Sequence, residues 1–148
     1  MKRIALALAI ALSGCAATMN TTDWQGNTFA YIAGEGVTLQ SNVWLNKMPM
    51  VGETGVKANA ALSLNALTTI SPDIEVVQVL FRQGEQEWRL SEEQYEIRPH
   101  EENYWEIAAS WKGEVDPSQR IDIAVELTDG NGGSEWLVEE QVKVAEVF

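Results

Sequence analysis

The sequence predicts an all-β protein: a single antiparallel β-sandwich of about seven to nine strands over residues 28–148. Three observations predict this fold. Apolar and polar residues alternate with a period of two, turn residues separate the alternating stretches at intervals of about 8 to 20 residues, and almost no stretch has a helical period. About 120 residues are enough for one hydrophobic core and too few for two.

The clearest strands alternate strictly between apolar and polar side chains, as half-buried strands do. They are residues 56–65, 105–111 and 121–128. Residues 37–46 alternate more weakly, and residues 74–81 are apolar on both faces, as expected for an inner strand. The side chains that we expect to be almost fully buried are Leu62, Ile107, Ile123 and Val125.

The last stretch, residues 136–147, changes phase near Glu139 and Glu140, where a β-bulge would return Val142 and Val144 to the core side. Short strands are expected at residues 29–33, 87–90 and 95–98. The segment 128–133 reads TDGNGG, which favours a tight hairpin between the last two strands. A calcium loop is the alternative, but glycines occupy the positions where further carboxylate ligands would stand.

This succession of short strands and turns generically resembles immunoglobulin-like and fibronectin type III-like domains. The likeness is architectural only, because the buried cysteine pair of true immunoglobulin domains is absent. A closed β-barrel is the alternative architecture.

The first 14 residues have the layout of a secretory signal. Lys2 and Arg3 are followed by an unbroken apolar run, residues 4–12, and then by the small residues Ser13 and Gly14. The run is far shorter than the roughly 20 apolar residues that a membrane-spanning helix needs.

The only cysteine follows directly, in Leu12-Ser13-Gly14-Cys15. This motif resembles the lipobox of bacterial lipoprotein precursors, Leu-Ser/Ala-Gly/Ala-Cys. The resemblance implies a covalent lipid on Cys15 and cleavage of the signal before it. Ala16 is not the aspartate that retains such proteins in the inner membrane, which implies an outer-membrane location if the source has two membranes. Residues 15–27 are then the lipidated cysteine and a small, polar, flexible tether.

The mature chain is strongly acidic. The signal holds two of the ten basic residues and no acid, so eight basic and 22 acidic side chains remain, with a net charge of −14. Such a surface repels phosphate backbones and anionic lipid, which argues against nucleic acid as a partner and leaves the lipid as the contact with the membrane.

Enzymatic chemistry finds little support in the sequence. His100 is the only histidine and lies in a polar segment, and no serine stands in a Gly-x-Ser-x-Gly elbow. Adjacent glutamates such as Glu92 and Glu93 point to opposite faces of a strand and cannot act together. We therefore expect no catalytic residue, no bound metal and no cofactor besides the lipid.

The tryptophans are the strongest binding signal, since six are many for this length. Those on apolar stripes are expected in the core: Trp105, Trp111 and Trp136. Trp24 is expected to pack on the edge of the domain. Trp44 shares its strand face with amides and should point outward, and the flexible apolar residues Met48 and Met50 follow it. This stretch is a candidate partner-binding patch; the alternative is that it folds over and closes the core.

Two functions remain open. The first is a non-catalytic accessory module of the cell envelope that faces the periplasm and binds another envelope protein, through a sheet edge or through the Trp44–Met50 stretch. The second is a glycan- or peptidoglycan-binding lipoprotein that uses exposed tryptophan rings. Two exposed, coplanar tryptophans would favour the second function.

Overall fold

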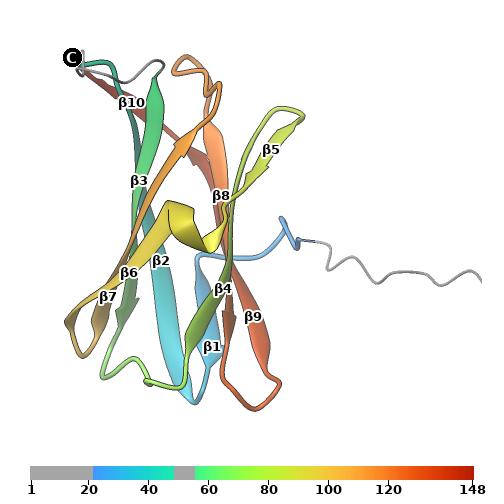
Figure 1. The fold of residues 1–148 in the computed structure, drawn as a ribbon. Coiled ribbons are helices and arrows are strands. Elements are labelled where there is room, and N and C mark those ends of the chain that lie inside the picture. The colour runs from blue at the N-terminus through green and yellow to red at the C-terminus, as the bar shows by residue number, and fades with distance from the viewer. Residues whose placement is uncertain (1–21, 49–55) are drawn as a thin grey trace, which may run out of the picture.

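The computed structural model describes residues 22–48 and 56–148, and these residues form two antiparallel sheets packed face to face (Figure 1). The predicted all-β sandwich is confirmed, with two separate sheets rather than one closed barrel. The described elements are β1 (Phe29–Ile32), β2 (Glu35–Asn46), β3 (Lys57–Ala66), β4 (Glu75–Gln83), β5 (Gln86–Arg89), the 3₁₀ turn η1 (Glu92–Gln94), β6 (Tyr95–Glu101), β7 (Tyr104–Lys112), β8 (Ile121–Thr128), β9 (Ser134–Val142) and β10 (Val144–Val147).

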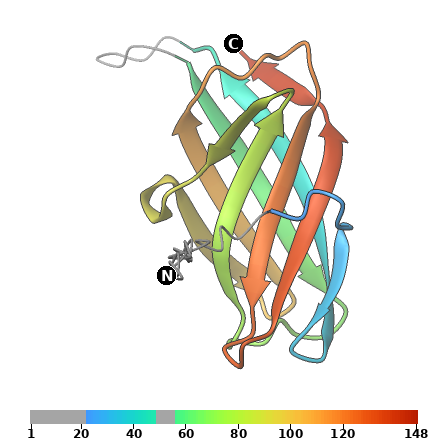
Figure 2. The same cartoon turned by 90° about the vertical axis from the view of Figure 1, so that its right-hand side faces the viewer.

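The strand order is that of an immunoglobulin-like sandwich. One sheet has the order β1-β2-β3-β7-β6, with β10 also paired to β2, and the other has the order β5-β4-β8-β9 (Figure 2). The chain crosses between the sheets after β3, β5, β7 and β9, and β2-β3-β7-β6 reproduces the order of the first sheet of that fold. The structure has ten strands among the described residues, slightly more than expected, because the last predicted stretch divides into β9 and β10.

The core lies between the inner faces of the two sheets. Leu62, Ile107, Ile123 and Val125 are fully buried there, as the alternation predicts. Phe81 from one sheet stacks on Trp111 from the other, with ring centroids 4.1 Å apart. The alternation therefore predicts the buried faces of β3 and β7 correctly. The exception is Val56, which precedes β3 and is exposed.

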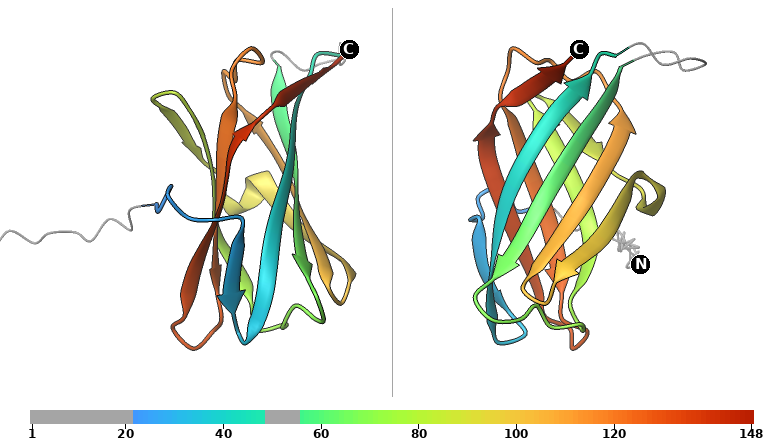
Figure 3. Two further views of the ribbon diagram at one scale, coloured as in Figure 1. Left: turned by 180° about the vertical axis from the view of Figure 1, so that it is seen from behind. Right: turned by 90° about the vertical axis from the view of Figure 1, so that its left-hand side faces the viewer.

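The last strand leaves one sheet and joins the other. Ile123 pairs with Glu139 whereas Ile121 pairs with Val142, so β9 has one extra residue and the predicted β-bulge is present. Gln141 has a φ of 59° at this point. Beyond the bulge, β10 pairs in parallel with β2, and its Val144 is buried (Figure 3).

This crossing seals one side of the sandwich. β1 pairs with the first residues of β2, up to Thr38, and β10 pairs with its last residues from Val43 onward, so the two strands share one edge of β2 (Figure 3). Just before β1, Asn27 forms a parallel bridge with Leu137 of β9. We call this the sealed side.

The opposite side of the sandwich is different. β5 pairs only with the Leu80–Gln83 part of β4, and the backbone N–H of Leu90 then donates to the carbonyl of Val79. β8 pairs with one edge of β4, but the other edge has no described strand beside it before Leu80, and β6 is likewise the outermost strand of its sheet. We call this the open side; in Figure 1 it faces the viewer, with η1 crossing its middle.

Candidate functional site

The segment before β1 lies across the outer face of the four-stranded sheet, where it crosses β8 and β9 (Figure 2). Trp24 packs there with Trp136 on a second, smaller apolar cluster: Leu80, Ala124 and Val138. Trp24 thus packs on the domain, but on the outer face of a sheet rather than on the predicted edge. Trp136 belongs to this outer cluster rather than to the core between the sheets, which corrects the expectation from its apolar stripe.

The guanidinium of Arg82 lies over the face of the Trp24 ring. The guanidinium carbon of Arg82 lies 4.3 Å from the centre of the Trp24 ring, and Arg82 donates two hydrogen bonds to Oδ2 of Asp122, at 2.9 and 3.2 Å. Oδ1 of Asp122 accepts a hydrogen bond from the backbone N–H of Gln141 in the bulge. The indole, the ion pair and the bulge are therefore one connected structure beside the sealed side.

The predicted lipidation site and one predicted contact residue lie outside the described residues: Cys15 and Met50. The described residues include no helix that is long and apolar enough to cross a membrane.

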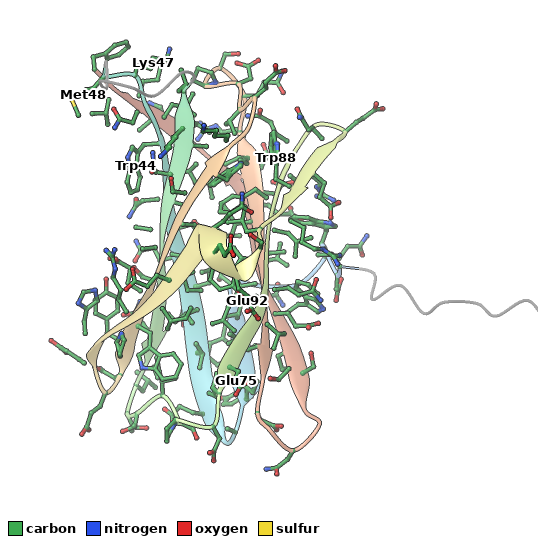
Figure 4. The ribbon with its side chains drawn as sticks, viewed as in Figure 1. Trp44, Lys47, Met48, Glu75, Trp88 and Glu92 are labelled. Carbon is green, nitrogen blue, oxygen red and sulfur yellow. The ribbon has the colours of Figure 1, made fainter. Side chains whose placement is uncertain are left out.

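Trp44 points outward from β2, as predicted, and is half-buried (Figure 4). Met48, which is 48% exposed, lies beyond the end of β2. Trp44 borders a shallow groove of about 470 Å³ on the outer face of the six-stranded sheet. Ala61 and Ala108 line this groove, and Met48 does not.

The outer face around this groove is unusually rich in amides and hydroxyls. Outward positions along β2 carry Gln40 and Asn42, and those on β3 and β7 carry Asn59, Ser63 and Ser110. Amides and hydroxyls both donate and accept hydrogen bonds, and the small alanines leave the depression between them. Arg98 closes the far side of the groove, where it pairs with Glu96 and Glu106.

All six tryptophans are described, and each is buried or half-buried. Trp88 and Trp111 are the only tryptophan pair in ring contact among the described residues; their planes are inclined by 51° and Trp111 is in the core. The two exposed, coplanar rings that would favour glycan binding are therefore not present in the described structure.

An apolar cleft opens on the open side, between the edges of the two sheets. Its volume is about 360 Å³, and its lining is Ile74, Glu75, Val76, Ile97, Pro99 and Trp105. Val76, Ile97 and Trp105 are only partly buried and pack against the core, so the cleft exposes core-type side chains to solvent. Sequence reasoning did not predict this cleft, because its lining comes from three strands that become neighbours only through the sheet order.

Glu75 lines the cleft, and Glu92 on η1 lies on the same open side (Figure 4). Glu101 and Glu102 follow the cleft residue Pro99 at the turn between β6 and β7. None of these four glutamates forms an ion pair with a lysine or arginine in the described part of the chain. The nearby cation Arg98 is already held by Glu96 and Glu106, at 3.2 and 3.7 Å.

Groups that could support chemistry are scattered. His100 stacks on Tyr104, and its Nε2 lies 3.8 Å from Glu106. Residues 22–48 and 56–148 contain no cluster of three or more His, Cys, Asp or Glu side chains arranged to hold a metal ion. The TDGNGG segment forms the predicted hairpin, in which Oδ1 of Asp129 accepts hydrogen bonds from the backbone N–H groups of Asn131 and Gly133.

One carboxylate stands out on the sealed side. Glu139 accepts a hydrogen bond of 3.0 Å from the backbone N–H of Ser41, at the gap on the edge of β2 between β1 and β10. Burial raises the pKa of the Glu139 carboxyl above its usual value, and this hydrogen bond opposes part of that shift. Glu139 therefore acts as a side-chain cap for an otherwise unpaired edge donor.

Comparison with known proteins finds no matching family model, no matching curated protein and no matching solved structure. The functional interpretation therefore depends on two surfaces of this chain: the groove beside Trp44 and the cleft on the open side.

Proposed function

We propose that this chain is a lipid-tethered, non-catalytic accessory protein of the cell envelope that binds another envelope protein. The lipid on Cys15 holds it to the membrane, at the periplasmic face of the outer membrane where the source has two membranes. The Leu12-Ser13-Gly14-Cys15 motif after a short apolar run supports the tether, and the acidic surface supports a domain that stands away from anionic lipid.

The observation that carries the binding function is the open side of the sandwich. Unpaired sheet edges present free backbone N–H and C=O groups and can pair with other strands. Here an uncovered edge of β4 lies beside an apolar cleft that already exposes Val76, Ile97 and Trp105. A free edge supplies main-chain hydrogen bonds to an added strand, and the cleft supplies a place for its side chains.

The tether is tested by replacing the lipobox cysteine. Cys15→Ser is expected to leave the full-length precursor uncleaved and without lipid, as shown by mass spectrometry and metabolic labelling with palmitate. Ser13→Ala is the matched control and is expected to mature normally, because alanine is accepted at that lipobox position. Normal maturation of the Cys15→Ser chain would sink the lipoprotein assignment.

The partner is tested by site-specific photo-crosslinking in intact cells. A photoreactive residue at Val77, which is 38% exposed on β4, is expected to yield one discrete cross-linked envelope protein. The same probe at exposed Gln119, in the loop between β7 and β8, is the control and is expected to yield none. Equal cross-linking from both positions would mean that the open side is not a specific contact.

Glycan binding is a second candidate function, favoured by the groove beside Trp44, whose lining includes Asn59, Gln94 and Ser110. Sugars need rings for their apolar faces and groups that both donate and accept hydrogen bonds. If the groove binds peptidoglycan, Trp44→Ala abolishes co-sedimentation of the soluble domain with purified sacculi, whereas Glu75→Lys on the open side does not. Absence of co-sedimentation of the unaltered domain rejects this function.

A further inference from the structure

We propose that the open-side cleft binds an extended segment of the partner in which one large apolar side chain is flanked by lysine or arginine. This inference rests on the proposed function and names the chemistry of its partner. It follows from three properties of the cleft: which edge is free, what lines the cavity, and which charges surround it.

The free edge selects an extended segment. The Glu75–Gln78 part of β4 has no strand on its outer side among the described residues, because β5 reaches only Leu80. β6 offers a poorer edge, since Pro99 lacks a backbone N–H. An incoming strand therefore pairs with the free Glu75–Gln78 edge of β4, next to η1.

The cavity selects one apolar anchor. Ile74 is buried at 3% exposure, whereas Val76, Ile97 and Trp105 are partly exposed around the cavity. A space of about 360 Å³ with this lining is large enough for an aromatic or branched aliphatic side chain. Such central anchors, surrounded by a polar rim, carry most of the energy of a protein interface.

The acidic side chains near the cleft favour a positively charged partner segment. Four glutamates at or near the cleft lack a cationic partner within the described structure, and Arg98, next to Pro99 on β6, is already paired. Flanking lysines or arginines on the partner would bring opposite charges to these glutamates, which steers association and weakens as salt rises.

The same charges disfavour the other occupants. A second copy of this chain brings another net charge of −14 to the cleft, and its own free edge carries the same glutamates. The segments of the chain outside the described structure that remain after signal removal, residues 15–21 and 49–55, contain no lysine or arginine. A basic segment of a different protein fits best.

Synthetic peptides test this chemistry on the soluble domain, residues 22–148. The probe is an acetylated seven-residue peptide of alternating lysine and threonine with phenylalanine at its centre. In two-dimensional NMR it is expected to shift the backbone amide signals of Glu75, Val77 and Ile97. Affinity should fall at least tenfold between 20 mM and 300 mM salt. Two control peptides are expected not to bind. One has glutamate in place of each lysine, and the other has alanine in place of the phenylalanine.

Charge reversal on the protein provides the matched control. Glu75→Lys combined with Glu92→Lys is expected to weaken binding of the basic peptide at least tenfold. Glu135→Lys combined with Glu140→Lys, at two exposed positions on β9, makes the same change of charge outside the cleft lining and is expected to change affinity less than twofold. Binding of the glutamate peptide, equal loss in the control, or self-association in sedimentation experiments would each overturn the inference.

The same variants separate this inference from the proposed function. If the basic peptide binds but cross-linking at Val77 in cells finds no envelope protein, the cleft chemistry stands and the proposed function fails. If cross-linking finds a partner and its yield is unchanged by the double Glu→Lys variant, the proposed function stands and the basic-segment inference is wrong.

Discussion

The two sides of this sandwich end their sheets in opposite ways. On the sealed side, β1 and β10 together cover one edge of β2, and the passage from β9 to β10 ties the sheets together. On the open side, β5 covers only the Leu80–Gln83 end of β4, and β6 is the outermost strand of its sheet.

The difference extends to single hydrogen bonds. On the sealed side, the backbone N–H of Leu39 donates to Thr28 at 2.7 Å, and the N–H of Ser41, which falls between β1 and β10, is capped by Glu139. The open side instead keeps core-type side chains in a solvent-accessible cleft with a charged rim. The backbone N–H groups described on the sealed edge have hydrogen-bond partners, whereas the open edge of β4 has no strand beside it. This is the arrangement expected of a domain that adds a partner strand at one side only.

The largest expected effect comes from the shared core, which supports both sides. Ile123→Ala should lower the free energy of unfolding by about 2–5 kcal/mol, because its fully buried side chain leaves a cavity between the sheets. Urea denaturation measures the change. Val77→Ala, at the exposed open edge, should cost less than about 0.5 kcal/mol. A loss below about 1 kcal/mol for Ile123→Ala would contradict the packing described.

Alternation was sufficient to predict the core because a half-buried strand exposes one face to water. Leu62 and Ile107 follow that rule, and the change of phase near Glu139 correctly predicts the bulge that returns Val144 to the core. The rule fails for Trp136, because Trp24 covers the outer face of β8 and β9. A strand with cover on both faces shows apolar residues in both phases, and its sequence alone does not say which face is inner.

The candidate sites divide in the same way. The outward direction of Trp44 could be predicted, since the amides beside it mark a solvent face. The cleft could not, because Val76, Ile97 and Trp105 become neighbours only through pairing between distant strands. Whether an edge is open depends on where β5 stops along β4, and strand ends are the least regular part of the sequence pattern.

Removal of Trp24 should weaken the outer cluster and the sealed side beside it, and should leave the open-side cleft unchanged. Trp24→Ala removes a half-buried indole from the outer cluster and leaves Arg82 without its ring contact, at an expected cost of about 1–3 kcal/mol. Hydrogen exchange measured by NMR should accelerate in β9 and β1, while the basic peptide still binds the open side. Trp24→Phe should lose less, and unchanged exchange in β9 would show that Trp24 does not support this side.

Trp44 belongs to neither edge, and its removal should lower the stability less than removal of Trp24 does. Trp44→Ala is expected to cost about 1 kcal/mol or less, because the side chain is half-buried over a groove with an alanine floor. The melting temperature should stay within a few degrees and peptide binding at the cleft should be unchanged. A loss of several kcal/mol would place Trp44 in the structural core instead of at a binding surface.

The smallest expected effect is a pH dependence located at the sealed side. Because burial raises the pKa of Glu139, the native state keeps this proton to higher pH than the unfolded chain does. The contribution of Glu139 to stability is therefore full below its ordinary pKa of 4.5 and is lost as pH rises through the higher native value. The Glu139→Gln side chain keeps an oxygen that accepts a hydrogen bond from the Ser41 N–H, but it cannot ionise. The stability of this variant relative to that of the unaltered domain should therefore increase between pH 4 and pH 7. Glu140→Gln, at the exposed neighbouring position, removes the same charge without the burial and corrects for the general repulsion in this acidic chain. An equal pH dependence in both variants would mean that the carboxylate at the edge of β2 is no more buried than its neighbour.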